Sequence, residues 1–309
     1  MDPTYPLFPI VSFTCFVLVF SPLPWHIQAR NTGTSMFAIW VGTCCLILFI
    51  NSVVWRNDVI DRAPIYCDIA TRILMGCSVS VPACGLCVQR RLYRISVLGP
   101  LKFDKHYEVK NFVIDMCICL GFPMFIMALA YVSQGHRYDI FEGYGCTYFI
   151  YDVWPSIPTF SMWPLVIALI SSVYCVRTFY ALAIRRSKLN EFLDSINSSA
   201  STKHYFRLMV LSCTEIVFTI PLSSWVLYME ITNMTKYISW TDTHSYFHVV
   251  RTYPSIIWRS EKALRPLVEF KQWIILVCAF VFIAFFTFGE DSRGNYGRIF
   301  SAVVKRLGW

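Results

Sequence analysis

Cysteine is the residue type here with the widest choice of chemistry, because a thiol can bind a metal, form a disulfide or pack as a small apolar side chain. The sequence contains 13 cysteines. Cys84 and Cys87 have the CxxC spacing of a zinc-binding pair, but no second ligand pair stands nearby and the segment around them is apolar. We therefore expect no metal site there. The other cysteines in apolar segments are expected to act as packing residues: Cys15, Cys44, Cys45, Cys77, Cys117, Cys119, Cys175, Cys213 and Cys278.

Histidine is the second residue type that could bind a metal or act in catalysis. His244 and His248 are four residues apart, a spacing that can hold a metal on one face of a helix. No acidic residue stands in register with them, so we expect both to lie in a loop, with His244 a candidate for shaping a ligand pocket. The histidines form no cluster with aspartates of the kind a membrane enzyme would need. The sequence thus predicts neither an enzyme nor a cofactor.

Charged residues within apolar segments need an explanation, because an unpaired charge in hydrocarbon is costly. Arg72 is interpreted as a hydrogen-bond donor at a ligand site or between helices, with snorkelling to the headgroups as the alternative. Glu215 lies eight residues beyond Arg207 and is a candidate for a structural or switch role. Asp115 and Arg177 stand near the ends of apolar segments, and both are expected to snorkel towards the membrane surface.

The elements that carry these residues are expected to be membrane-spanning helices. Of the 309 residues, 56% are hydrophobic and only 15% charged, whereas a soluble domain has about 25% charged residues. Seven apolar runs are each about as long as the roughly 20 residues that cross a bilayer, if the third is extended back to Tyr66. We predict an all-α bundle of seven transmembrane helices in residues 1–289 and a short tail in 290–309. The runs are 3–25, 31–55, 73–89, 116–135, 153–176, 208–229 and 272–289.

The distribution of basic residues predicts how this bundle is oriented. If the N-terminus is extracellular and the C-terminus cytoplasmic, seventeen of the 27 Lys and Arg residues fall on the cytoplasmic side. That agrees with the positive-inside rule. The net charge of +8 is then explained by the membrane, and nucleic acid is not expected to be a partner.

This topology places the two remaining cysteines, Cys67 and Cys146, on the extracellular, oxidising side. We predict a disulfide between them, which would pin the second outer loop across the mouth of the bundle. The alternative is two free thiols.

In the sixth run, Pro221 removes one backbone hydrogen bond and should kink the helix. The kink is interpreted as a hinge for signal transmission, with a static kink as the alternative.

Short segments in a fixed order make the sequence similar to a known family. They are PLPWHIQARNTGT (22–34), NSVVW (51–55), APIYCDIATRI (63–73), QRRLYRI (89–95), GYGCTY (143–148), YFRLM (205–209), SWTDTHSYF (239–247) and FGEDSRGNY (288–296). The chain resembles the fungal mating-pheromone receptors of the lipidated a-factor type, which are seven-helix G-protein-coupled receptors, nearly from end to end. The resemblance implies a plasma-membrane receptor that binds a secreted, prenylated peptide pheromone and activates a heterotrimeric G protein.

Within this interpretation, aromatic and basic residues are the candidates for binding. Membrane-interface belts explain most of the aromatic residues near the outer ends. Some are candidates for lining an apolar cleft for the prenyl chain. The aromatic candidates for ligand binding are Tyr148, Trp154, Trp225, Tyr228 and Trp240, in addition to Arg72 and His244 named above. Candidates for G-protein coupling are Arg90, Arg91, Arg94 and Arg207, although attraction to anionic membrane lipid also accounts for them. The alternative function is a transporter, which would need ligands near the middle of the membrane; only Glu215 meets that requirement.

Overall fold

A computed structural model describes residues 4–98, 105–184, 199–262 and 264–287 of the chain. The side chains of Arg207 and Glu215 lie outside the described residues, as does the tail 290–309.

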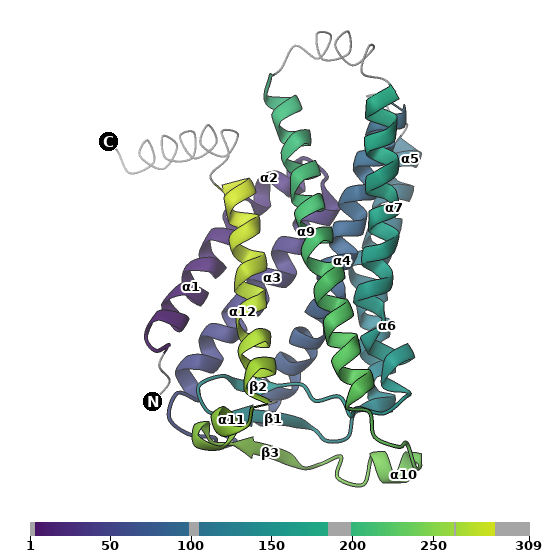
Figure 1. Cartoon of the computed structure of the whole chain (residues 1–309). Helices are drawn as coiled ribbons and strands as arrows, with labels where there is room; N and C mark the ends of the chain where they lie inside the picture. Colours follow the sequence, from purple (N-terminus) through teal and green to yellow (C-terminus); the bar gives the residue numbers. More distant parts are fainter. Residues whose placement is uncertain (1–3, 99–104, 185–198, 263, 288–309) are drawn as a thin grey trace, which may run out of the picture.

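Long helices run side by side and form a bundle, with a small sheet across one end (Figure 1). We call this the sheet end. The first half of the chain contains α1 (Leu7–Phe20), α2 (Leu23–Gln28), α3 (Thr32–Val54), α4 (Pro64–Leu98), α5 (Lys105–Met116), η1 (Cys117–Gly121), α6 (Phe122–Leu129) and η2 (Ala130–Ser133). The second half contains η3 (Ile157–Ser161), α7 (Trp163–Ile184), α9 (Ser199–Thr232), α10 (Trp240–Thr243), α11 (Ser255–Ser260), α12 (Leu264–Phe282) and η4 (Ile283–Thr287).

Six helical stretches in the described part of the chain are long and apolar enough to cross a membrane. In hydrocarbon every backbone N–H and C=O must be bonded internally, and a helix achieves this within one segment. The helical, multi-span expectation is therefore confirmed for six of the seven runs. The remaining run corresponds to α9, whose shorter apolar part is Ile216–Thr232.

The core of the bundle is built around α3 and α4. α4 packs on α3 and α7, and α3 also contacts α1 and α12. Gly33 lies at a close approach of α3 and α4, because a Cβ atom there would stand 3.0 Å from the carbonyl oxygen of Cys84. Small residues at such crossings let helix backbones approach each other in a membrane, where van der Waals packing drives association.

The sheet was not part of the all-α expectation. It has the order β2-β1-β3, formed by β2 (Gly145–Thr147), β1 (Tyr138–Phe141) and β3 (Val250–Tyr253). β1 pairs antiparallel with β2, with Ile140 opposite Cys146, and parallel with β3, with Ile140 opposite Thr252. The connection after η2, which carries β1 and β2, and the connection after α9, which carries β3, are thereby joined into one cap.

We predict that Gly33→Ala will lower the melting temperature of the detergent-solubilised protein. The added Cβ must push α3 and α4 apart, and such overpacking costs about 1–3 kcal/mol. Gly121→Ala is the matched control, because a Cβ there meets nothing within 4 Å. An unchanged melting temperature for Gly33→Ala would contradict the close approach of the two helices.

Candidate functional site

The sheet end is attached to the bundle by a disulfide. Cys67 at the start of α4 is bonded to Cys146 of β2, and their Cα atoms are 5.5 Å apart. This lies within the usual range of about 4.4–6.8 Å for disulfides. Because Cys146 is held by β2, the bond attaches the cap to the helix that packs on both α3 and α7.

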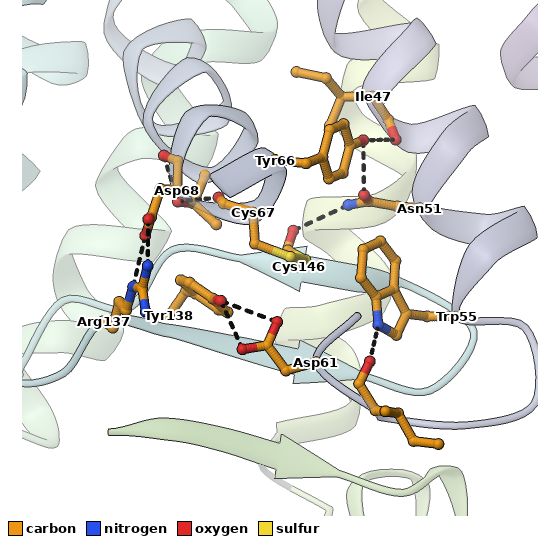
Figure 2. Close-up of a disulfide and its surroundings, with 12 residues drawn as sticks. Ile47, Asn51, Trp55, Asp61, Tyr66, Cys67, Asp68, Arg137, Tyr138 and Cys146 are labelled. Carbon is orange, nitrogen blue, oxygen red and sulfur yellow. Dashed lines mark hydrogen bonds and ion pairs between the residues drawn. A yellow bond between two sulfur atoms is a disulfide. The ribbon is translucent and has the colours of Figure 1, made fainter. Parts of the chain in front are cut away.

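Hydrogen bonds from the end of α3 support the same junction (Figure 2). The Asn51 side-chain amide donates to the carbonyl oxygen of Cys146 at 3.0 Å, and the Tyr66 hydroxyl donates to Asn51 Oδ1 at 3.0 Å. Gly145 has a positive φ of 80°, and a Cβ there would stand 2.6 Å from that of Asn51. Only glycine fits this backbone conformation and this space. Three of the segments quoted for the family resemblance therefore meet at one point.

Ionic and polar contacts tie Arg137 and the first residue of β1 to the start of α4 and to the connection before it. Arg137 donates two hydrogen bonds to the Asp68 carboxylate, at 2.9 and 2.6 Å, and hydrogen bonding to Asp68 raises the pKa of Arg137. The Tyr138 hydroxyl donates to the carboxylate of Asp61 at 3.0 Å (Figure 2). Burial, more than this hydrogen bond, raises the pKa of Tyr138. The cap is thus fixed by charge and by hydrogen bonds as well as by the disulfide.

Two of the candidate ligand residues are half-buried at the sheet end. Arg72 donates a hydrogen bond to the Gln134 side chain, which in turn donates to the carbonyl oxygens of His136 and Arg137. Arg72 is therefore used as a donor between elements. Tyr148 packs against the apolar cores on both sides of α4, and burial raises its pKa.

The other candidate aromatic residues are exposed. Trp154, Trp225 and Tyr228 are 60%, 36% and 62% exposed, which suits membrane-interface positions better than a closed pocket. Trp240 stacks on His244 with ring centroids 4.0 Å apart, and His244 Nε2 lies 3.0 Å from the carbonyl oxygen of Tyr131. The structure thus brings Trp240 and His244 together in a cluster at α10.

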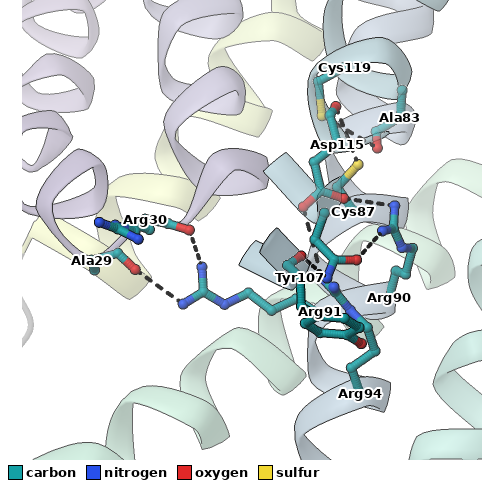
Figure 3. A network of polar contacts seen from close by, with 11 residues as sticks. Ala29, Arg30, Ala83, Cys87, Arg90, Arg91, Arg94, Tyr107, Asp115 and Cys119 are labelled. Carbon is teal, nitrogen blue, oxygen red and sulfur yellow. Dashed lines mark hydrogen bonds and ion pairs between the residues drawn. The ribbon is translucent and has the colours of Figure 1, made fainter. Parts of the chain in front are cut away.

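The opposite end of the bundle carries a network around Asp115, and we call it the arginine end (Figure 3). Arg90 on α4 donates to Asp115 at 2.9 Å and to Asn111 at 2.8 Å, both on α5, while Arg94 lies 3.9 Å from Asp115. The expectation that Asp115 snorkels is wrong: the Asp115 side chain is only 10% exposed, because a neighbouring helix supplies its counter-charge. Arg177, by contrast, is exposed.

Arg91 fixes the connection between α2 and α3. Its guanidinium donates to the carbonyl oxygens of Arg30 and Ala29, at 2.6 and 3.1 Å, and Arg30 forms an ion pair with Glu108 (Figure 3 shows the two carbonyl contacts). Three of the arginines proposed for coupling therefore also have partners within the bundle. The side chain of the fourth, Arg207, lies outside the described residues, as does that of Glu215. Pro221 lies inside α9.

The sequence interpretation missed Glu230 and Lys271. Both stand just outside the apolar runs that predict the sixth and seventh spans, 208–229 and 272–289, so hydropathy places them in the connections. In the structure α9 continues to Thr232 and α12 already begins at Leu264. A count of apolar residues cannot detect such extensions. The signal that could have found them is that a helix can continue through the charged residues at the end of an apolar run.

Comparison with known proteins decides the family. The sequence matches the family described as Pheromone A receptor over residues 7–306. The chain belongs to that family. It is thus a multi-pass membrane protein of a receptor family, and the plasma membrane is its expected location.

Several fungal receptors are similar to the chain. The Pheromone B alpha 3 receptor of Schizophyllum commune is 37% identical over 310 residues, covering 100% of this chain and 49% of that protein. Pheromone receptor 1 of Mycosarcoma maydis is 28% identical, covering 97% and 84%. The Pheromone a factor receptor of Saccharomyces cerevisiae is 21% identical, covering 93% and 60%. The chain spans about half the length of the Schizophyllum relatives that it matches.

The disulfide generates the first prediction for the site. Cys67→Ser and Cys146→Ser should each lower the melting temperature, and the double variant should melt no lower than the single ones. Loss of a native disulfide typically costs about 2–5 kcal/mol. Cys117→Ser is the control, because Cys117 is a free, exposed cysteine. Additive effects of the two substitutions would contradict the covalent bond.

The arginine end generates the second. Asp115→Leu leaves Arg90, whose side chain is 13% exposed, without its counter-charge. Removing one partner of a buried ion pair costs about 3–5 kcal/mol, whereas replacing both partners by apolar residues costs far less. We expect Asp115→Leu to unfold at a lower temperature than the double variant Arg90→Leu/Asp115→Leu. A double variant that is less stable than Asp115→Leu would contradict the pairing.

Proposed function

We propose that this chain is the membrane domain of a receptor that binds a secreted, prenylated peptide pheromone and activates a heterotrimeric G protein. The observation that carries the proposal is the match to the Pheromone A receptor family over residues 7–306. The names of the relatives, which include a pheromone a factor receptor, support the same ligand class. In this proposal α9 is the sixth of seven spans, the sheet end is extracellular and the tail 290–309 is cytoplasmic.

The chemistry of the two ends supports this orientation. A disulfide persists in an oxidising compartment, so the bond between Cys67 and Cys146 favours an extracellular sheet end. Arginines cluster at the opposite end, as the positive-inside rule expects of the cytoplasmic side.

The proposed ligand site lies at the sheet end, and the proposed coupling surface lies at the arginine end. Exposed aromatic residues beside the cap, among them Trp154, Trp240 and Tyr228, offer apolar surface at the level where a prenyl chain would rest in the outer leaflet. Arg90, Arg91, Arg94 and Arg207 remain the candidates to contact the G protein. For Arg90, contact with the G protein would compete with its ion pair to Asp115. Pro221 and Glu215 are proposed to let α9 change shape between the two ends.

A transporter is the weaker candidate. Substrate and ion ligands of transporters lie near the middle of the membrane. In the described part of the chain, the charged networks lie instead at the two ends of the bundle (Figures 2 and 3).

The proposed function is tested by expressing the chain in a pheromone-responsive fungal cell that lacks its own receptor. A panel of farnesylated, C-terminally methyl-esterified peptides is applied, and a mating-pathway reporter is measured. We expect at least one peptide to induce the reporter, and its unfarnesylated form to lose at least tenfold in potency. Burial of a prenyl chain is worth up to about 0.8 kcal/mol per methylene-like group, part of which comes from membrane partitioning.

The same cells without the receptor are the control for this experiment. Equal potency of the farnesylated and unfarnesylated forms would contradict the prenylated ligand. No response to any peptide of the panel, from a receptor shown to be on the cell surface, would contradict the proposed function.

A further inference from the structure

Lys271 on α12 is a cation at the sheet end without a salt bridge to the described residues. Its ammonium lies 4.7 Å from the centroid of the Tyr148 ring, and no described carboxylate oxygen lies within 4.0 Å of it. A cation over an aromatic face is attracted by the ring, but the ring accepts no conventional hydrogen bond from its three N–H groups. Lys271 therefore retains donors for an additional partner.

Three carboxylates act on Lys271 from a greater distance: Asp139, Glu230 and Asp152. Asp139 already pairs with His136, with Nε2 and Oδ1 2.5 Å apart. Asp152, in the connection before η3, is exposed to solvent. Glu230 on α9 is therefore the half-buried member of the three that forms no salt bridge with the described residues.

The environment of Glu230 contains unused polar atoms. Its Oε2 is buried and makes no hydrogen bond with the described residues. Ser161, only 8% exposed, is the polar side chain that acts on this carboxylate, but its buried hydroxyl lies outside hydrogen-bond geometry. Buried polar atoms are nearly always bonded in folded proteins, so a group of unbonded ones marks a place for another molecule.

The two charged residues stand on helices that have different packing neighbours. α9 packs on α7 and α4, whereas α12 packs on α3 and α1. Near the sheet end they meet through the rings of Trp225 and Phe270, whose centroids are 5.9 Å apart. A molecule that bonds to both Glu230 and Lys271 would link the two halves of the bundle beneath the cap (Figure 1).

We propose that Lys271 and Glu230 bind the main chain of the peptide ligand. Lys271 donates to a peptide carbonyl oxygen, and Glu230 accepts from a peptide N–H. A peptide backbone carries both groups side by side, which matches an unbonded donor on one helix and an unbonded acceptor on another. This assignment rests on the proposed function and adds the residues that hold the peptide part of the pheromone.

The test is a binding measurement on membranes, with the farnesylated peptide of the panel that gives the largest response as a fluorescent probe. Lys271→Met and Glu230→Gln remove the donor and the charged acceptor, and we expect each to weaken affinity at least tenfold. Lys262→Met is the matched control, because Lys262 is an exposed lysine at the same end. It should bind like the unmodified receptor. Surface expression is measured for every variant, so that lost folding is not mistaken for lost affinity.

The charge-swapped variant Lys271→Glu/Glu230→Lys distinguishes ligand binding from a structural ion pair. It keeps opposite charges on α9 and α12 but reverses the donor and the acceptor. We expect normal surface expression and weak binding. Recovery of full affinity in the swapped variant, or unchanged affinity of Lys271→Met, would overturn the assignment while leaving the proposed function intact. Failure of the unmodified receptor to bind any farnesylated peptide would overturn the proposed function and the peptide ligand named here with it.

Discussion

The constraint on which this structure depends is that polar groups within a bilayer must be satisfied by the protein itself. Helices satisfy the backbone, and this fixes the architecture. The same constraint acts on side chains, where a charge needs a partner from another helix or access to water. Asp115 shows the consequence: Arg90 and Arg94 of α4 neutralise a carboxylate on α5 and thereby fasten two helices together.

The two ends of the bundle meet this constraint in different ways. At the arginine end the donors of Arg90 and Arg91 are bonded to a carboxylate, an amide and backbone carbonyls. The cap at the sheet end is equally well fixed by the Cys67–Cys146 bond and by Arg137 with Asp68. Beneath that cap, however, Lys271 and Glu230 form no salt bridge within the part of the chain that the structure describes. A rigid cap over unbonded polar groups is the arrangement expected of a binding site, because preorganised walls reduce the entropy cost of binding.

Hydropathy predicted most of the architecture, since crossing a membrane imposes a length and a composition that a sequence displays directly. The predicted topology placed Cys67 and Cys146 on the same side of the membrane, and this led to the predicted disulfide between them. The cap was missed because β1 is four residues long and buried at every position, so it shows no alternation. Asp115 was misjudged because distance from the end of an apolar run says nothing about a counter-charge on another helix. Glu230 and Lys271 were missed because the charges that end an apolar run do not end the helix.

The central claim is that the peptide binds beneath the cap, between α9 and α12. The measurement that tests it most directly is a cryo-electron microscopy structure of the receptor with its most active farnesylated peptide bound. The account predicts peptide density within hydrogen-bond distance of both Lys271 and Glu230, with the Cys67–Cys146 bond intact above it. Peptide density elsewhere, with Lys271 and Glu230 closed onto each other as a direct salt bridge, would contradict it.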